Sequence, residues 1–470
     1  MRATPQRHED DSIFFDLARS LCPECRKLLD AQVLIRDNKV FMRKRCPDHG
    51  LFEGLIYADA EMFVSAMRHN KPGSIPLQFS TEVKDGCPFD CGLCPEHKQH
   101  ACLGIIEVNT ACNLDCPVCF ANAGPGYNLT LAEVERMLDR FVECEGTGEV
   151  VQFSGGEPSI HPEIVPMLRA AKRRPIKHVM LNTNGLRIAK DDAFLADLAE
   201  IGPTIYMQFD GLLPQTSLAL RGEDLVDIKR RALDRLASVG LNAVLVAAIE
   251  RGVNENEIGP LLNFGLGHPA VRGINYQPMM HTGRHPAFDP LQRVTIPDVI
   301  KAIEKQTGGQ FAVQDFVPVP CCFPTCTSVT YAYVEEGKVT SLPRLLNVED
   351  YLDYLANRTI PDLSQEVLKA LEGLWSASAV PGTEMMGKML GDACCKLDLP
   401  GLSQEFASRF FMVMVKDFMD LYTFSLKSLM KCCVEVLVPD GRMIPFCAYN
   451  TVGYREQVRE QLRARTGVGR

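Results

Sequence analysis

The chain has 470 residues, 46% of them hydrophobic, so it can bury a large core and is long enough for two or three domains. The net charge of −9 and the scarcity of basic runs argue against a nucleic acid partner. Residues 1–12 are polar, and the longest apolar runs, such as 243–249, fall far below the roughly 18 residues that a membrane span requires. We therefore expect a soluble, cytoplasmic protein.

The 19 cysteines are the most informative feature of the composition. Cytosolic thiols are kept reduced, and a core of this size needs no disulfides, so metal binding is the default interpretation. The cysteines fall in blocks, and the blocks divide the chain. We expect a rubredoxin-like or zinc-knuckle module at 1–75, an iron–sulfur loop at 76–103, a barrel at 104–310, and a cysteine-rich domain for a cluster and substrate at 311–470.

The first block contains two short knuckles about twenty residues apart. Cys22 and Cys25 form the first knuckle, and Cys46 and His49 form the second, which together supply the four donors of one tetrahedral site. Between them, residues 31–45 alternate as a β-hairpin does, with Asp37 and Asn38 at the turn. The donor types suit both zinc and iron, so the metal stays open.

The second block places four thiols within sixteen residues: Cys87, Cys91, Cys94 and Cys102. Four thiolates can ligate every iron of a 4Fe–4S cluster, and the surrounding glycine and proline favour tight turns. A zinc knuckle is the alternative interpretation.

From residue 104 onward the chain alternates strand and helix patterns. Strands are expected at 104–109, 150–158, 178–185, 204–211, 242–250 and 271–279, and helices at 129–144, 190–201, 224–239 and 254–266. Six such units predict an α/β fold with a partial (β/α)6 barrel, whose functional groups lie at the carboxyl ends of the parallel strands. The polar and glycine-rich segments 154–157, 182–185 and 208–211 all occur at those ends and should face one cavity.

The loop after the first of these strands, "NTACNLDCPVCFANAG", places Cys112, Cys116 and Cys119 in the spacing C-x3-C-x2-C. Three thiolates hold three irons of a cubane cluster and leave the fourth iron open to a chelating small molecule. An open coordination position implies chemistry rather than a purely structural role.

These motifs resemble those of the radical S-adenosylmethionine (SAM) superfamily, whose catalytic core would cover about 104–306. The resemblance implies that the three cysteines hold a 4Fe–4S cluster that binds SAM, and that Gly155, Gly156 and Glu157 line its methionine moiety. It offers further cofactor contacts at Asn182, Asn184, Gln208 and Asp210. An aromatic residue usually precedes the third cysteine, but here that residue is Val118, and Phe120 follows.

The flanking blocks resemble those of the archaeal tetraether lipid synthase family, some members of which are described as pterin methylases. That resemblance implies one mononuclear iron and two auxiliary clusters besides the radical cluster. Thiols for the second auxiliary cluster are Cys321, Cys322, Cys326, Cys394, Cys395, Cys432, Cys433 and Cys447. Because neighbouring residues of a strand face opposite sides, only one of Cys432 and Cys433 is expected to serve a given cluster.

Residues 408–430 carry many phenylalanines and methionines in what we interpret as a helical repeat. A packed core is the simpler interpretation, and an apolar substrate channel is the alternative.

Three functions compete. The first is a radical enzyme that generates a 5′-deoxyadenosyl radical and joins the alkyl chains of lipids, in peripheral contact with a membrane. The second is a radical methyltransferase acting on a pterin, and the third is an electron carrier or binding module without catalysis. Either enzyme needs an electron donor such as ferredoxin or flavodoxin. No residue is assigned a catalytic role, and the apolar C-terminal half favours a lipid substrate over a pterin.

Overall fold

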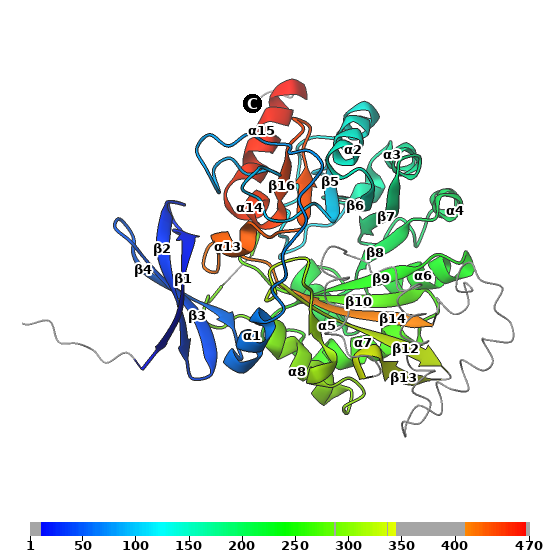
Figure 1. Ribbon diagram of the computed structural model, residues 1–470. Helices are drawn as coiled ribbons and strands as arrows, with labels where there is room; N and C mark the ends of the chain where they lie inside the picture. The colour runs from blue at the N-terminus through cyan, green and yellow to red at the C-terminus, as the bar shows by residue number, and fades with distance from the viewer. Residues whose placement is uncertain (1–10, 286–287, 336, 345–408, 467–470) are drawn as a thin grey trace, which may run out of the picture.

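The computed structural model describes residues 11–285, 288–335, 337–344 and 409–466 (Figure 1). The described part begins with a four-stranded antiparallel sheet in the order β1-β2-β3-β4, followed by a short helix, α1 (Ala60–Met67). The strands are β1 (Ile13–Leu21), β2 (Leu28–Arg36), β3 (Lys39–Cys46) and β4 (Gly50–Tyr57). Asp37 and Asn38 have φ angles of 49° and 53°, as the tight turn between β2 and β3 requires, so the predicted hairpin is confirmed. We call residues 13–57 the ribbon.

The expected parallel barrel is present. Its strands are β5 (Leu103–Asn109), β6 (Gly148–Gly155), β7 (Ile176–Thr183), β8 (Thr204–Gln208), β9 (Ala243–Ile249) and β10 (Val271–Pro278), each parallel to the next. Its helices are α2 (Leu131–Glu145), α3 (Ile164–Lys172), α4 (Asp192–Ile201), α5 (Pro214–Arg221), α6 (Val226–Ser238) and α7 (Ile258–Gly267). α2 begins at a reciprocal capping box between Thr130 and Glu133 and packs its apolar stripe on the sheet. Helix α8 (Ile296–Gln306) follows the barrel.

Strands from residues 409–466, which we call the C-terminal segment, extend both edges of the barrel sheet. β14 (Phe410–Lys416) runs parallel to β10, and β15 (Val434–Leu437) runs parallel to β5. Outside them lie β11 (Val317–Pro318), β12 (Thr327–Glu335), β13 (Lys338–Ser341) and β16 (Met443–Pro445). The described residues also form the helices α13 (Leu426–Leu429), α14 (Phe446–Thr451) and α15 (Tyr454–Thr466), and 3-10 turns at Pro158–Ile160, Glu255–Glu257, Val313–Asp315 and Leu342–Arg344.

The helical interpretation of 408–430 is wrong for its first part. Residues 410–416 form β14, in which Phe411, Val413 and Val415 are buried and the residues between them are only half-buried. This is a period of two, and β-branched side chains favour it. Aromatic residues and methionines at short spacing fit both periods, which is why the composition misled the prediction.

The ribbon is fixed to the C-terminal segment by a buried lysine. Lys44 is 2% exposed, and its ammonium donates hydrogen bonds to the Ser20 hydroxyl at 2.8 Å and to the carbonyls of Leu421 and Tyr422.

Among the residues described, no helix has both the length and the apolar character to cross a bilayer.

Candidate active site and metal centres

The loop between β5 and α2 brings its three cysteines to one cavity. Cys112, Cys116 and Cys119 line a space of about 230 Å³ at the carboxyl ends of the barrel strands. The Leu114 amide donates to the Cys112 sulfur at 3.4 Å, and the Ala123 amide donates to the Cys119 sulfur at 3.5 Å. Burial raises the pKa of Cys112 to about 11, so a thiolate there needs a bound cation. Three thiols with amide donors on the rim of a cavity fit a cluster with one open iron.

Gly155, the last residue of β6, and Gly156, which follows it, allow the chain to pass against this loop. A Cβ on Gly156 would lie 2.2 Å from the Ala111 carbonyl oxygen, and Gly155 has a φ of +140°. The next residue, Glu157, is 2% exposed and accepts hydrogen bonds from the Thr183 hydroxyl and the Asn184 amide, both at 2.7 Å. These contacts hold the Glu157 carboxylate at the cavity wall beside the cysteines.

The other predicted cofactor contacts divide into two kinds. Asn182, Asn184 and Gln208 line the cavity. Asp210 instead binds Arg221 through both carboxylate oxygens, at 2.7 and 2.8 Å, and is 5% exposed. Asp210 therefore orients Arg221, whereas its own contact with SAM stays a prediction.

Two cations of the site escaped the sequence analysis. Arg221, at the end of α5, lines the cavity, and Lys229, on α6, donates to the Gln208 side chain and is 4% exposed. Burial raises the pKa of the Cys116 thiol, and the charge of Arg221 opposes that rise. Neither Arg221 nor Lys229 belongs to a recognisable motif. They reach the site because helices α5 and α6 follow directly after the 208–211 segment.

Side chains from several strands add a polar belt to the same cavity. Gln152 lies on β6, Tyr206 on β8, Gln277 on β10 and Lys416 on β14. The Gln277 amide donates to the Tyr206 hydroxyl at 3.1 Å. The opposite wall is apolar and includes Met279, Met280, Phe418 and Phe446.

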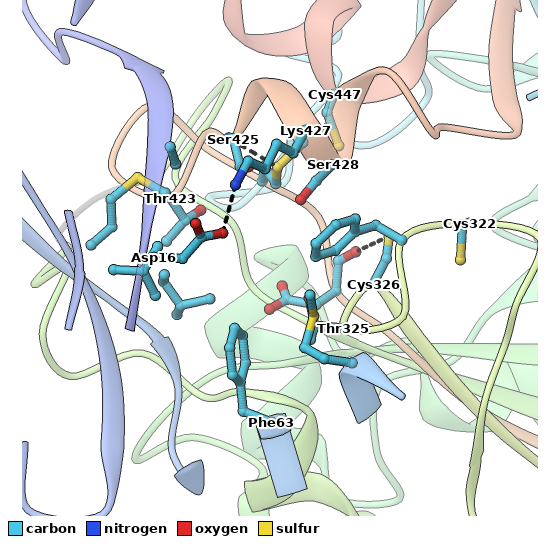
Figure 2. A pocket seen from close by; sticks show the side chains of 18 of the residues that line it. Asp16, Phe63, Cys322, Thr325, Cys326, Thr423, Ser425, Lys427, Ser428 and Cys447 are labelled. Carbon is cyan, nitrogen blue, oxygen red and sulfur yellow. Dashed lines mark hydrogen bonds and ion pairs between the residues drawn. The ribbon is translucent and has the colours of Figure 1, made fainter. Parts of the chain in front are cut away.

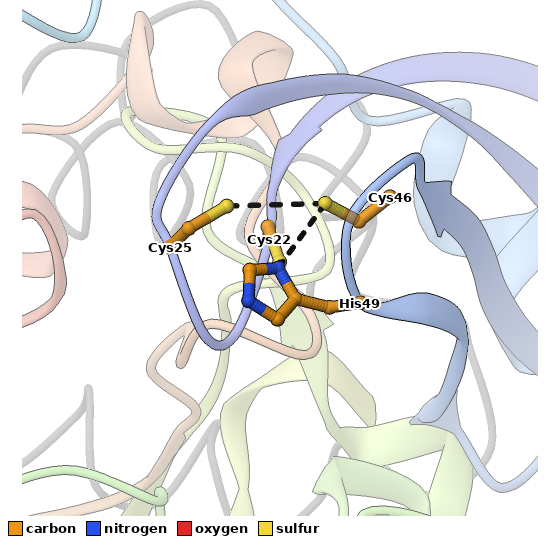
Figure 3. A group of neighbouring side chains, drawn as sticks. All are labelled: Cys22, Cys25, Cys46 and His49. Carbon is orange, nitrogen blue, oxygen red and sulfur yellow. Dashed lines mark hydrogen bonds between the residues drawn. The ribbon is translucent and has the colours of Figure 1, made fainter.

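The ribbon brings together all four of its predicted donors (Figure 3). The Cys25 and Cys46 sulfurs are 3.8 Å apart, and Nδ1 of His49 lies 3.5 Å from the Cys46 sulfur and 3.7 Å from that of Cys22. Metal–sulfur bonds of about 2.3 Å at tetrahedral angles would place two sulfurs about 3.8 Å apart. The geometry fits one metal ion.

The grouping expected for the second block needs correction. Cys87, Cys91 and Cys94 line one small cavity, but Cys102 lies with Cys321 and Cys433 instead. The register of the sheet explains this: Leu103 of β5 pairs with Val434 of β15, so the residues that precede each strand lie side by side. Closeness in sequence suggested the wrong partners, because Cys102 already belongs to the start of the barrel.

A second cavity, of about 90 Å³, lies between the ribbon and the C-terminal segment. Cys322, Cys326, Cys432 and Cys447 line it from the C-terminal side, and ribbon residues and Phe63 of α1 line it from the other (Figure 2). Cys432 lines this cavity, whereas its neighbour Cys433 lies with Cys102 and Cys321, and which of the two serves a cluster stays a prediction. Cys394 and Cys395 lie outside the described residues.

The comparisons with known proteins agree with this geometry. Residues 106–265 match the radical SAM superfamily, and residues 14–58 match the HMPTM N-terminal zinc ribbon domain. A 7,8-dihydro-6-hydroxymethylpterin dimethyltransferase of Methanocaldococcus jannaschii is 35% identical over 94% of both chains. The chain belongs to this radical SAM family. It is therefore a radical SAM enzyme, for which a 4Fe–4S cluster and SAM are implied, and the zinc ribbon favours zinc at the four-donor site.

More distant relatives match the barrel region alone. A GTP 3′,8-cyclase of Chlorobaculum tepidum is 30% identical over 43% of this chain and 63% of its own length. The crystal structure of Streptococcus suis SuiB covers 44% of this chain and 46% of its own at 19% identity, with a TM-score of 0.38. Among these matches, the full-length one bears the name of a pterin enzyme rather than a lipid enzyme.

Proposed function

We propose that this radical SAM enzyme is a methyltransferase that acts on a pterin. The observation that carries the proposal is the full-length relative, which shares 35% of its residues over 94% of both chains and is named a hydroxymethylpterin dimethyltransferase. Similarity that extends beyond the barrel includes the C-terminal residues that line the substrate cavity, such as Lys416, Phe418 and Phe446.

The lining of the cavity supports a pterin over an alkyl chain. A flat heterocycle buries ring nitrogens, an amino group and a carbonyl, each of which needs a partner. Gln152, Tyr206, Gln277 and Lys416 provide amide, hydroxyl and ammonium groups around one space. Tyr206 and Lys416 already have protein partners, but an alkyl chain could use none of the remaining hydrogen-bonding capacity of these groups, whereas a pterin could.

The sequence argument for a lipid therefore looked in the wrong half of the chain. It sought a dense polar cluster among the C-terminal residues, but most of the polar belt comes from single residues on separate barrel strands. Such residues come together only when the strands pair in the sheet.

The chain's own residues bind and orient the reactants. When bound, the cluster and SAM supply a 5′-deoxyadenosyl radical that abstracts hydrogen from carbon. Cys112, Cys116 and Cys119 would hold the cluster, with Glu157 and Arg221 placed to meet the charged ends of methionine. The apolar wall at Phe418 and Phe446 excludes water from the reacting carbon. An electron donor such as ferredoxin or flavodoxin would supply the electron.

Mass spectrometry tests the proposal. In the first experiment, the protein is purified without oxygen and incubated with reductant, SAM and 7,8-dihydro-6-hydroxymethylpterin. In the second, it is expressed in a host that makes the lipid precursors of tetraethers, and the lipids are extracted. We expect a pterin heavier by one or two CH2 units and unchanged lipids. Covalently coupled lipid chains, lighter by two hydrogens per new bond, together with an unmodified pterin would contradict the proposal.

Tyr206→Phe, which removes one hydroxyl of the polar belt, should raise KM for the pterin more than it lowers kcat.

A further inference from the structure

Arginines from the last helix bind the backbone that follows the third cysteine of the radical SAM loop. Every fourth residue on one face of α15 is an arginine: Arg455, Arg459 and Arg463. Their guanidinium groups donate hydrogen bonds to carbonyls within residues 121–125, at distances between 2.6 and 3.0 Å. Helix α15 is thus fastened to the loop that would hold the radical cluster, although more than 330 residues separate the partners in the chain.

One of these hydrogen bonds acts on the same peptide group as a hydrogen bond to sulfur. Arg459 donates to the Asn122 carbonyl at 3.0 Å. The Ala123 amide donates to the Cys119 sulfur at 3.5 Å. The carbonyl and the amide belong to a single planar trans peptide group, in which the C=O and the N–H point in opposite directions. Arg459, which holds the C=O, therefore fixes the direction in which the N–H points.

The backbone at this peptide group adopts a conformation that needs such support. Asn122 has a φ of 45°, in the left-handed region that residues other than glycine rarely occupy. Its own amide donates to the Cys119 carbonyl at 2.9 Å, which closes a tight turn beside the cysteine. Arg459 and the buried Arg455 both donate to the Ala121 carbonyl, one residue earlier. Charged donors from α15 thus hold this turn.

We propose that Arg459 is a positioning residue that raises the reduction potential of the radical cluster by aiming the Ala123 amide at the Cys119 sulfur. A hydrogen bond to a ligating sulfur stabilises the more negative, reduced form of an iron–sulfur cluster. Because the electron donor must reduce this cluster by one electron before SAM is cleaved, the bond assists that transfer. It makes α15 part of the redox site, although no described residue of α15 lines the cavity. The proposal does not depend on the identity of the substrate.

The midpoint potential of the radical cluster tests the proposal. It is measured in the full chain, reconstituted with iron and sulfide, by a redox titration followed with electron paramagnetic resonance. The radical cluster is the one whose reduced signal changes when SAM is added. Arg459→Met should shift the ratio of oxidised to reduced cluster at a fixed potential about fivefold toward the oxidised form, the effect of one weakened hydrogen bond. Arg463→Met removes the same charge about one helical turn away, where the partner is the Pro125 carbonyl, and should keep the parent potential.

An equal shift in the two variants would show a general effect of charge and would overturn the proposal, as would an unchanged potential in Arg459→Met. Should Arg459→Met not hold its cluster, two variants of Asn122 test the same peptide group. Asn122→Gly adopts the left-handed φ freely and should keep the parent potential. Asn122→Val, whose branched side chain disfavours that φ, should shift the ratio in the same direction as Arg459→Met. Equal potentials in the two Asn122 variants would contradict the proposal.

Discussion

The ribbon site and the radical SAM loop both gather cysteines from short stretches of chain, but they do so with opposite geometry. The ribbon brings four donors within 4.8 Å of one another, held by two hairpin knuckles. The loop spreads three thiols around the rim of a cavity of about 230 Å³, next to a glycine pair and Arg221. A closed set of four donors satisfies a metal and stabilises a fold, whereas an open set of three leaves a position for a reactant.

The largest expected effect comes from the open set. Replacement of Cys112, Cys116 and Cys119 together by alanine should reduce the formation of 5′-deoxyadenosine below detection, because the cluster whose open iron binds SAM is lost. The protein should still contain iron, held by the other thiol groups. Loss of all iron in this variant would mean that the sites are not separate.

Gly156→Ala should cause the second largest loss of activity. The new Cβ would lie 2.2 Å from the Ala111 oxygen and would push the cysteine loop away from β6. A displacement of about 1 Å at a reactive site can cost about 100-fold in rate, which we expect for 5′-deoxyadenosine formation. Gly267→Ala, where the added Cβ meets nothing within 4 Å, is the matched control and should keep normal activity. Equal rates in the two variants would refute the close packing.

Removal of the ribbon metal should affect stability more than chemistry. Cys22→Ser/Cys25→Ser should lower the free energy of unfolding by several kcal/mol, since metal binding at such sites contributes folding energy. Thermal melting measures the effect, and turnover per folded molecule should stay within about 10-fold of the parent. A normal melting temperature in a variant that has lost its metal would contradict a structural role.

Lys44→Met should give a smaller loss. It removes the hydrogen bonds to Ser20, Leu421 and Tyr422 and leaves buried acceptors unpaired, which costs about 1–3 kcal/mol. Arg19→Met, which breaks an exposed pair with Asp30 on the same sheet, is the control and should melt normally. If both variants melt alike, the ribbon is not anchored by Lys44.

Cys144→Ala should have the smallest effect. This thiol is fully buried on α2 and stands apart from every metal group in the described part of the chain, so it behaves as a small apolar side chain. We expect a loss of about 1 kcal/mol and unchanged metal content. A measured fall in iron or zinc would assign Cys144 to a site.

The sequence predicted most where the signal is local or periodic. The barrel, the hairpin at Asp37 and Asn38, and the strand-end position of Gly155 and Gly156 all follow from spacing and turn chemistry. The sequence analysis failed for residues that are distant in the chain and come together because their strands pair in the sheet. Cys102 joined Cys433 through the pairing of β5 with β15, and Arg221 reached the site through contacts that no motif encodes.

The central claim is that the cavity beside Cys112, Cys116 and Cys119 performs radical chemistry on a pterin. Its most direct test is the rate of 5′-deoxyadenosine release by reduced protein with SAM, measured with and without 7,8-dihydro-6-hydroxymethylpterin. We predict a release that rises with pterin concentration, saturates, and matches the appearance of methylated product. A rate of 5′-deoxyadenosine release that does not depend on pterin concentration, with no methylated product at any concentration, would contradict the account.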